Sequence, residues 1–86
     1  MITGVAIRYF DRGVIALPAP ARHGDVIFYV MDNYGRRTFG SDEQGFVDEN
    51  GVFYGRYDAY RIAEENDQLI GEHVGPDGML FSEDLW

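Results

Sequence analysis

Residues 44–69, QGFVDENGVFYGRYDAYRIAEENDQL, contain the signals that decide the fold. Asn50-Gly51 lies between two short runs rich in aromatic and β-branched residues, and an Asn-Gly pair in that position favours a hairpin turn. Residues 56–69 then place apolar residues at helical spacing: Ala59, Ile62 and Ala63, with Tyr60 beside them. The stretch therefore predicts a β-hairpin that leads directly into an α-helix.

The first half of the chain predicts the same order of elements. Residues 2–9 and 14–18 are two apolar runs joined by Asp-Arg-Gly, in which Gly13 is free to take a positive φ. Two prolines end the second run, and Pro20 can occupy the first turn of a helix, where its missing N–H costs little. Apolar residues at helical spacing then continue to an expected helix end at Gly35.

Together these elements predict a small single α+β domain over residues 1–86. Its expected order is two β-hairpins, each followed by an α-helix, then a short C-terminal strand at residues 79–81 and a tail. Residues 71–78 contain three glycines and a proline, and we expect them to form a loop before that strand. A chain of this length supports one core of modest size.

The chain is acidic, and its charge is unevenly distributed. Fifteen acids face seven arginines and no lysine, which gives a formal charge of −8. Residues 1–43 contain five Arg and five acids, whereas residues 44–86 contain two Arg and ten acids. Direct binding of a nucleic-acid backbone by the second half is therefore not expected. Two interpretations stay open: the charge serves solubility, or it forms an acidic face that docks on a basic partner in place of nucleic acid.

Other classes of site are disfavoured by what the sequence lacks. There is no cysteine, hence no disulfide framework and no thiolate zinc site. No apolar run approaches the roughly 18 residues that span a membrane, and the N-terminus lacks a signal-peptide pattern. No catalytic or nucleotide-binding motif is present. The spacing of His23 and His73 supports no metal site, and no cofactor is expected.

The first candidate site is PARHGD, residues 20–25. Arg22, His23 and Asp25 fall in the first turn of the expected helix, where free backbone N–H groups and the helix dipole attract anions. Arg22 adds a bidentate donor for phosphate or carboxylate, and Asp25 could orient either neighbour. Three interpretations stay open: an ordinary exposed first turn, a ligand contact, or general acid–base catalysis by His23.

The second candidate site is FYGRYDAYR, residues 53–61. Arg56, Tyr57, Tyr60 and Arg61 gather guanidinium and phenol groups around the start of the second helix. Such mixtures can stack on a flat ring and hold a phosphate. Alternatively, the arginines pair with acids of the same helix, and Tyr57 simply contacts Arg61 four residues later.

The third candidate is the tail, LFSEDLW, residues 80–86, which ends in the only tryptophan of the sequence. Glu83 and Asp84 separate its apolar residues from Leu85 and Trp86. The tail either folds back to complete the core of a small domain or acts as a docking peptide that a partner captures. We expect Trp86 to pack against the domain, because an exposed Trp beside Leu85 would favour aggregation.

The order of PARHGDVI, the hairpin–helix of residues 44–69 and SEDLW resembles a group of small phage and prophage proteins. That group has a PARHHDVI-like helix start, a QGF…G.F..R.EA..IA hairpin–helix and a SEDLW-like end. Three positions depart from its pattern: Gly24 replaces a second His, Asp58 a Glu, and Asp67 a Gly. The positions that match are Arg22, His23, Asp25, Gln44, Gly45, Phe46, Phe53, Arg56, Ala59, Gln68, Ser82, Glu83, Asp84, Leu85 and Trp86.

The resemblance implies a phage accessory protein in the cytoplasm of a bacterial host, where proteins of this size often counter host defence. Our leading hypothesis is a non-enzymatic protein that sequesters a small anionic, nucleotide-like ligand between Arg22 and His23 on one side and Arg56 and Tyr57 on the other. The tail or a second subunit of a homo-oligomer would complete such a pocket. One alternative is an acidic inhibitor that covers the basic nucleic-acid-binding surface of a host defence protein. Another is a small nucleotide hydrolase that uses His23.

Overall fold

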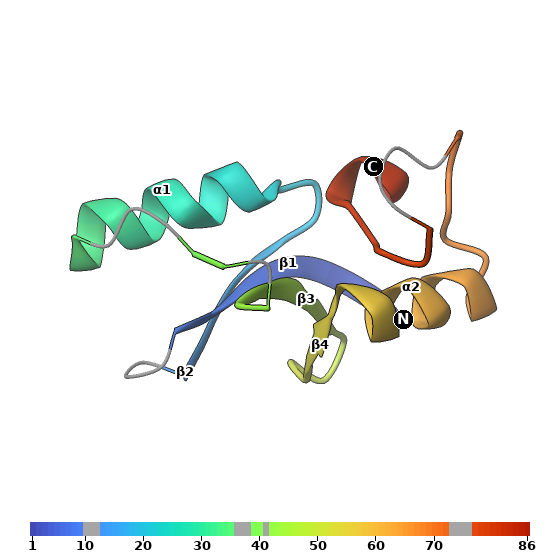
Figure 1. The fold of residues 1–86 in the computed structure, drawn as a ribbon, viewed down its shortest axis with the longest axis horizontal. Helices are drawn as coiled ribbons and strands as arrows, with labels where there is room; N and C mark the ends of the chain where they lie inside the picture. Colours follow the sequence, from blue (N-terminus) through green and yellow to red (C-terminus); the bar gives the residue numbers. More distant parts are fainter. Residues whose placement is uncertain (10–12, 36–38, 41, 73–76) are drawn as a thin grey trace.

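The computed structural model describes residues 1–9, 13–35, 39–40, 42–72 and 77–86. These residues form one four-stranded antiparallel sheet in the order β2-β1-β3-β4 and two α-helices (Figure 1), so the predicted α+β fold is confirmed. The elements are β1 (Ile2–Tyr9), β2 (Gly13–Pro18), α1 (His23–Tyr34), β3 (Gln44–Asp48), β4 (Phe53–Gly55), α2 (Arg56–Glu65) and the 3₁₀ turn η1 (Ser82–Asp84).

Both predicted hairpins are present, and they share one sheet. β1 pairs with β2, and β3 pairs with β4, in each case antiparallel. The turn glycines Gly13 and Gly51 have the positive φ that such turns require, 75° and 79°. A further antiparallel pairing of β1 with β3 joins the two hairpins. β1 is therefore a central strand, and its middle residues Val5, Ala6 and Ile7 are fully buried.

The first helix begins later than Pro20 and ends where the sequence predicts. Arg22 is its N-cap residue, and His23 is its first helical residue. Pro20 lies before the helix in a turn closed by a hydrogen bond from the Ala21 N–H to the Pro18 carbonyl, so its expected place in the first helical turn is wrong. The chain needs that turn to reverse direction between β2 and α1. Gly35 ends the helix in the left-handed conformation with φ 81°.

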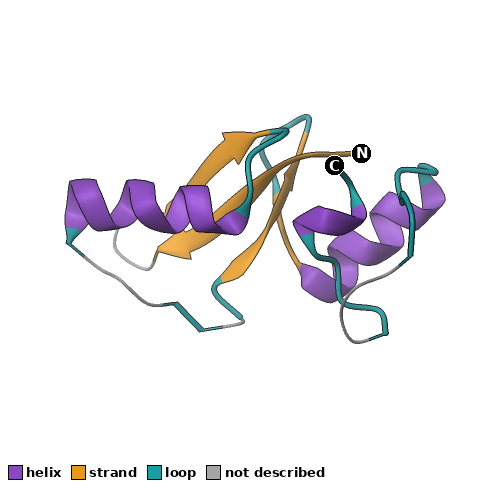
Figure 2. Cartoon of the chain, turned by 90° about the horizontal axis from the view of Figure 1, so that it is seen from above, coloured by secondary structure: helices purple, strands orange, loops and turns teal. Residues whose placement is uncertain are grey.

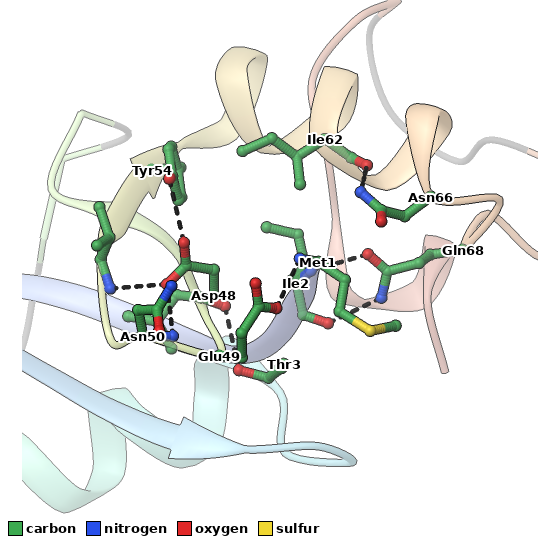
Figure 3. A network of polar contacts seen from close by, with 12 residues as sticks. Met1, Ile2, Thr3, Asp48, Glu49, Asn50, Tyr54, Ile62, Asn66 and Gln68 are labelled. Atoms are coloured by element: carbon green, nitrogen blue, oxygen red, sulfur yellow. Dashed lines mark hydrogen bonds and ion pairs between the residues drawn. The ribbon is translucent and has the colours of Figure 1, made fainter.

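The second helix is shorter than the predicted range 56–69, because it ends at Glu65. Asp67 has a positive φ of 56°, which turns the chain away from the helix axis. The side-chain amide of Gln68 then pairs with the backbone of Ile2, accepting from its N–H and donating to its carbonyl, both at 2.8 Å (Figure 3). A long-range pairing with β1 therefore replaces the last turn that the sequence predicts.

The predicted strand at residues 79–81 is also wrong. Leu80 makes one backbone hydrogen bond, from its N–H to the carbonyl of Arg56, and the chain then enters η1. A single bond at the start of α2 cannot extend the sheet, so the segment is an extended connection to the tail.

α1 lies at one end of the molecule, and α2 with the tail lies at the other, with the sheet between them (Figures 1 and 2). Val26 and Val30 of α1 and Ala59 and Ala63 of α2 are buried against the sheet. Phe46 of β3 is the largest fully buried side chain. No helix within the described part of the chain is long and apolar enough to cross a membrane.

Candidate functional site

The three segments that the sequence singled out meet in one place, which we call the tail junction. It comprises Arg22 and His23 at the start of α1, Gln44–Phe46 of β3, Arg56 at the start of α2, and residues 80–86. Trp86 donates its indole N–H to the carbonyl of Ala21 at 2.9 Å. Leu80 is fully buried, and Leu85 is 8% exposed. The structure thus places the tail against the domain beside the beginning of α1.

His23 is an internal residue of this junction. Its side chain is 8% exposed, and its ring meets Phe46 edge-on with centroids 4.8 Å apart. Nε2 lies 2.7 Å from the carbonyl oxygen of Gly45. Because a carbonyl can only accept, Nε2 carries the proton. Burial lowers the pKa of His23 to about 4, so the ring is neutral at pH 7. The hydrogen bond from this buried neutral ring to Gly45 therefore attaches the start of α1 to β3.

Arg22 contacts the tail. Its backbone N–H donates to the carboxylate of Asp25 at 2.8 Å, which caps the first turn of α1. Its Nη1 lies 3.4 Å from a carboxylate oxygen of Glu83 and 3.5 Å from Oγ of Ser82. Glu83 is exposed, and the pair is correspondingly weak. Asp25 therefore has a capping role, and Arg22 links α1 to η1.

Arg56 joins three segments through two different donors. Its Nη1 donates to the carbonyl of Leu80 at 2.7 Å, and its Nη2 donates to the amide oxygen of Gln44 at 3.2 Å. The guanidinium also lies over the ring of Phe81, 4.5 Å from its centroid. Burial lowers the pKa of Arg56 from its usual value, but an arginine in this range stays charged. Its cation is thus satisfied by a backbone carbonyl, an amide and a π-face.

A second feature, which we call the arginine hollow, begins at the same arginine. It is a surface hollow of about 480 Å³ between β1, β4 and the start of α2. Tyr57 is 61% exposed at this site. The residues that line it are Arg8, Asp42, Phe53, Tyr54, Gly55, Arg56, Tyr57, Asp58 and Met79.

Arg8 was not among the residues selected from the sequence. It stands on β1, its guanidinium lies 5.1 Å from the centroid of Phe53, and its Nη2 donates to the carbonyl of Asp42 at 3.2 Å. Residues 2–9 have the sequence of an ordinary apolar strand. Because successive side chains of a strand point to opposite faces of the sheet, Arg8 is expected on the face opposite Ile7, and only this signal would have singled it out. The neighbourhood of Phe53 depends on the pairing of β1, β3 and β4.

The sequence-selected residues divide between these two features. Arg56 and Tyr57 line the arginine hollow, whereas Arg22, His23 and Asp25 do not. Tyr60 is half-buried and packs against the core. Arg61 is exposed and forms an ion pair with Asp58 three residues earlier on α2, as one interpretation of the sequence expected.

The acidic residues of the second half of the chain lie in different structural settings. Glu64, Glu65 and Asp67 are exposed at the end of α2. Asp48 instead organises the β3–β4 turn, where it accepts the N–H groups of Asn50 and Val52 and the hydroxyl of Tyr54 (Figure 3). The hydrogen bond from Val52 is the main cause that lowers the pKa of Asp48. Among the described residues, no group of three or more His, Asp or Glu side chains could hold a metal ion.

Comparison with known proteins identifies one family. The family model described as Phage T4 y16D protein matches residues 1–86. No curated protein and no solved structure matches the chain. The match confirms the resemblance to small phage proteins at the level of the family.

Proposed function

The chain belongs to this family of phage proteins, and from that premise we propose that it is a non-enzymatic accessory protein that sequesters a small anionic, nucleotide-like ligand in the arginine hollow. In the cytoplasm of an infected bacterium, such a protein would counter defence by lowering the free concentration of a nucleotide signal. The size of the chain and its phage family support this setting by analogy.

One observation supports the ligand class: two guanidinium groups and exposed aromatic surface line a single hollow. Arg8 and Arg56 reach it from different elements, and Tyr57 presents an open ring. Planar guanidinium groups match phosphate oxygens in a bidentate geometry, and aromatic rings stack on a nucleobase. The volume of about 480 Å³ lies within the range of small-molecule sites.

Two acids also line the hollow, and their positions are compatible with an anion. Asp58 is paired with Arg61, which offsets much of its charge. The backbone carbonyl of Asp42 accepts from Arg8 and holds that arginine at the rim. A ligand would therefore meet two cations and also the carboxylate of Asp42, which favours a ligand with hydrogen-bond donors as well as a negative group.

The test is titration calorimetry of the full chain with a panel of nucleoside mono- and diphosphates and cyclic dinucleotides. Native mass spectrometry of the protein from infected cells would show a retained small molecule and the oligomeric state. Arg8→Gln and Tyr57→Ala should each weaken binding at least tenfold without unfolding the protein, because both side chains are on the surface. Arg22→Gln is the matched control, because Arg22 does not line the hollow and its guanidinium forms an exposed pair with Glu83. Equal affinity of all three variants, or no binding of any nucleotide, would overturn the proposal.

A second candidate function is supported by the exposed acids Glu64, Glu65 and Asp67 at the end of α2. On this proposal the protein is an inhibitor, and its acidic second half covers the basic nucleic-acid-binding surface of a host defence protein. The hydrolase hypothesis gains no support from the geometry, because the ring of His23 is buried and donates to Gly45.

A further inference from the structure

The helix α1 is apolar on more sides than the domain covers. Residues 26–31 are six apolar or aromatic residues in succession. Val26 and Val30 are fully buried against the sheet, yet Phe28 is 62% exposed and Tyr29 is 44% exposed. A helix that is apolar all round is usually covered on all sides. The outer side of α1, which includes Phe28 and Tyr29, is not covered by the domain, and it is therefore a candidate contact surface.

The outer side is a well-defined face. At 3.6 residues per turn, positions 25, 28, 29 and 32 fall within about 100° of arc, on the side away from the buried positions 26 and 30. Phe28 and Tyr29 lie at the two edges of this arc, midway along the helix axis between Asp25 and Asp32. Asp25 and Asp32 are exposed and flank this pair, one turn before and one turn after it. We call these four residues the α1 face.

Other exposed large apolar residues in the described part of the chain do not form such a pair. Met1, Val14, Val52 and Ile70 lie on separate segments, and isolated residues of that kind are normal on protein surfaces. Tyr34 is on α1 itself, but it lies about 180° around the helix from Asp25 and so outside the α1 face. Tyr57 belongs to the arginine hollow. None of the residues of the α1 face lines that hollow, so the two surfaces are independent.

We propose that the α1 face docks on a partner protein whose surface offers an apolar socket rimmed by lysine or arginine. The charges of the face select this occupant. Two copies that paired antiparallel about the centre of the face would place Asp25 of each opposite Asp32 of the other, in chains that each have a net charge of −8. An anionic membrane surface would be repelled in the same way. A basic rim complements both carboxylates, while the two rings fill the socket, as in helix-in-groove recognition.

The experiment places the photo-crosslinking residue p-benzoylphenylalanine at position 28 of the full chain, expressed in bacterial cells. The control has the same residue at position 52, which is exposed to a similar degree on the β3–β4 turn. We expect an ultraviolet-dependent adduct with one protein at position 28 and not at position 52. Mass spectrometry should map the crosslinked partner peptide to an apolar site bordered by basic residues.

Charge reversal at Asp32, at one end of the α1 face, provides a second test of the proposal. Asp32→Lys should reduce the adduct about tenfold or more, since like charges juxtaposed at an interface are strongly unfavourable. Glu72→Lys makes the same change in net charge at an exposed site away from α1 and should leave the adduct unchanged. Thermal melts of each variant verify the fold. An adduct of twice the mass of the chain, an adduct insensitive to Asp32→Lys, or no adduct at position 28 would overturn the proposal.

Discussion

Removing residues 82–86 should lower the free energy of unfolding by about 3–5 kcal/mol. The main loss is Leu85, which is 8% exposed and whose burial alone is worth about 1.5–3 kcal/mol. The hydrogen bond from the Trp86 indole to Ala21 adds about 1 kcal/mol. The cavity left in the core cluster that contains Leu85 increases the loss. The exposed pair of Arg22 with Glu83 adds between nothing and about 1 kcal/mol.

A loss of that size is large for a domain of this length. Small domains are stable by about 5–15 kcal/mol in total, and each kcal/mol changes the melting temperature of such a domain by about 4–8 °C. The truncated chain should therefore melt at least about 12 °C lower. Circular dichroism is the appropriate signal in thermal and urea unfolding, because the truncation also removes the only tryptophan.

A point substitution separates packing from chain length. Leu85→Ala should destabilise by about 2–5 kcal/mol, whereas Ile70→Ala, at a site that is 51% exposed, should change stability by less than about 0.5 kcal/mol. If the truncated chain and Leu85→Ala melted like the parent, the tail would not stabilise the domain. That result would refute this reasoning and favour capture of the tail by a partner.

Four further predictions rest on the same structure. The folded His23 ring stays neutral with a pKa of about 4, whereas the unfolded ring protonates below about 6.5. Between pH 7 and pH 5 the parent should therefore lose about 2 kcal/mol more stability than His23→Gln in urea titrations. Equal pH profiles would contradict this. Gly45→Ala should destabilise by at least about 1–3 kcal/mol in thermal melts, since its Cβ would strike the carbonyl of Tyr54 and the ring of Phe53. Gly24→Ala, where nothing lies within 4 Å, should instead stabilise by up to about 1 kcal/mol. On the inhibitor proposal, reversing Glu64 and Glu65 to lysine should slow association with a basic partner, and added salt should do the same; salt-insensitive kinetics would count against it.

The elements that the sequence predicts correctly have local causes. Gly13 and Gly51 adopt the positive φ that the two hairpin turns require, and Gly35 ends α1 through its own conformation. Asp11 and Arg12 of the predicted first turn lie outside the described residues. The incorrect predictions concern segments whose structure depends on contacts with residues far away in the sequence. α2 stops early because Gln68 bonds to Ile2, 66 positions away, and residues 79–81 form no strand because their backbone meets the start of α2.

The same contrast between local signals and long-range contacts applies to the candidate site. Residue type drew attention to Arg22, His23, Arg56 and Trp86, and the fold brings all four to the tail junction. Their partners could not be predicted, because an arginine side chain takes whichever acceptor the fold places beside it. Here the acceptors include tail atoms, such as the carbonyl of Leu80 and the carboxylate of Glu83. Arg8 was missed because it meets Phe53 only through the pairing of distant strands.

Arg56 connects the tail junction with the arginine hollow, and this decides how each can be tested. One donor of its guanidinium is bonded to Leu80 and the other to Gln44, and lysine cannot reproduce two separately directed donors of this kind. Arg56→Lys would therefore weaken the tail packing even if no ligand existed, and lost binding in that variant could not be assigned to the hollow. Arg8 and Tyr57 line the same hollow, and Arg8 donates to the carbonyl of Asp42, which is not part of the tail. A ligand that depends on Arg8 and Tyr57 while the tail stays packed would thus show that the hollow is a binding site in its own right.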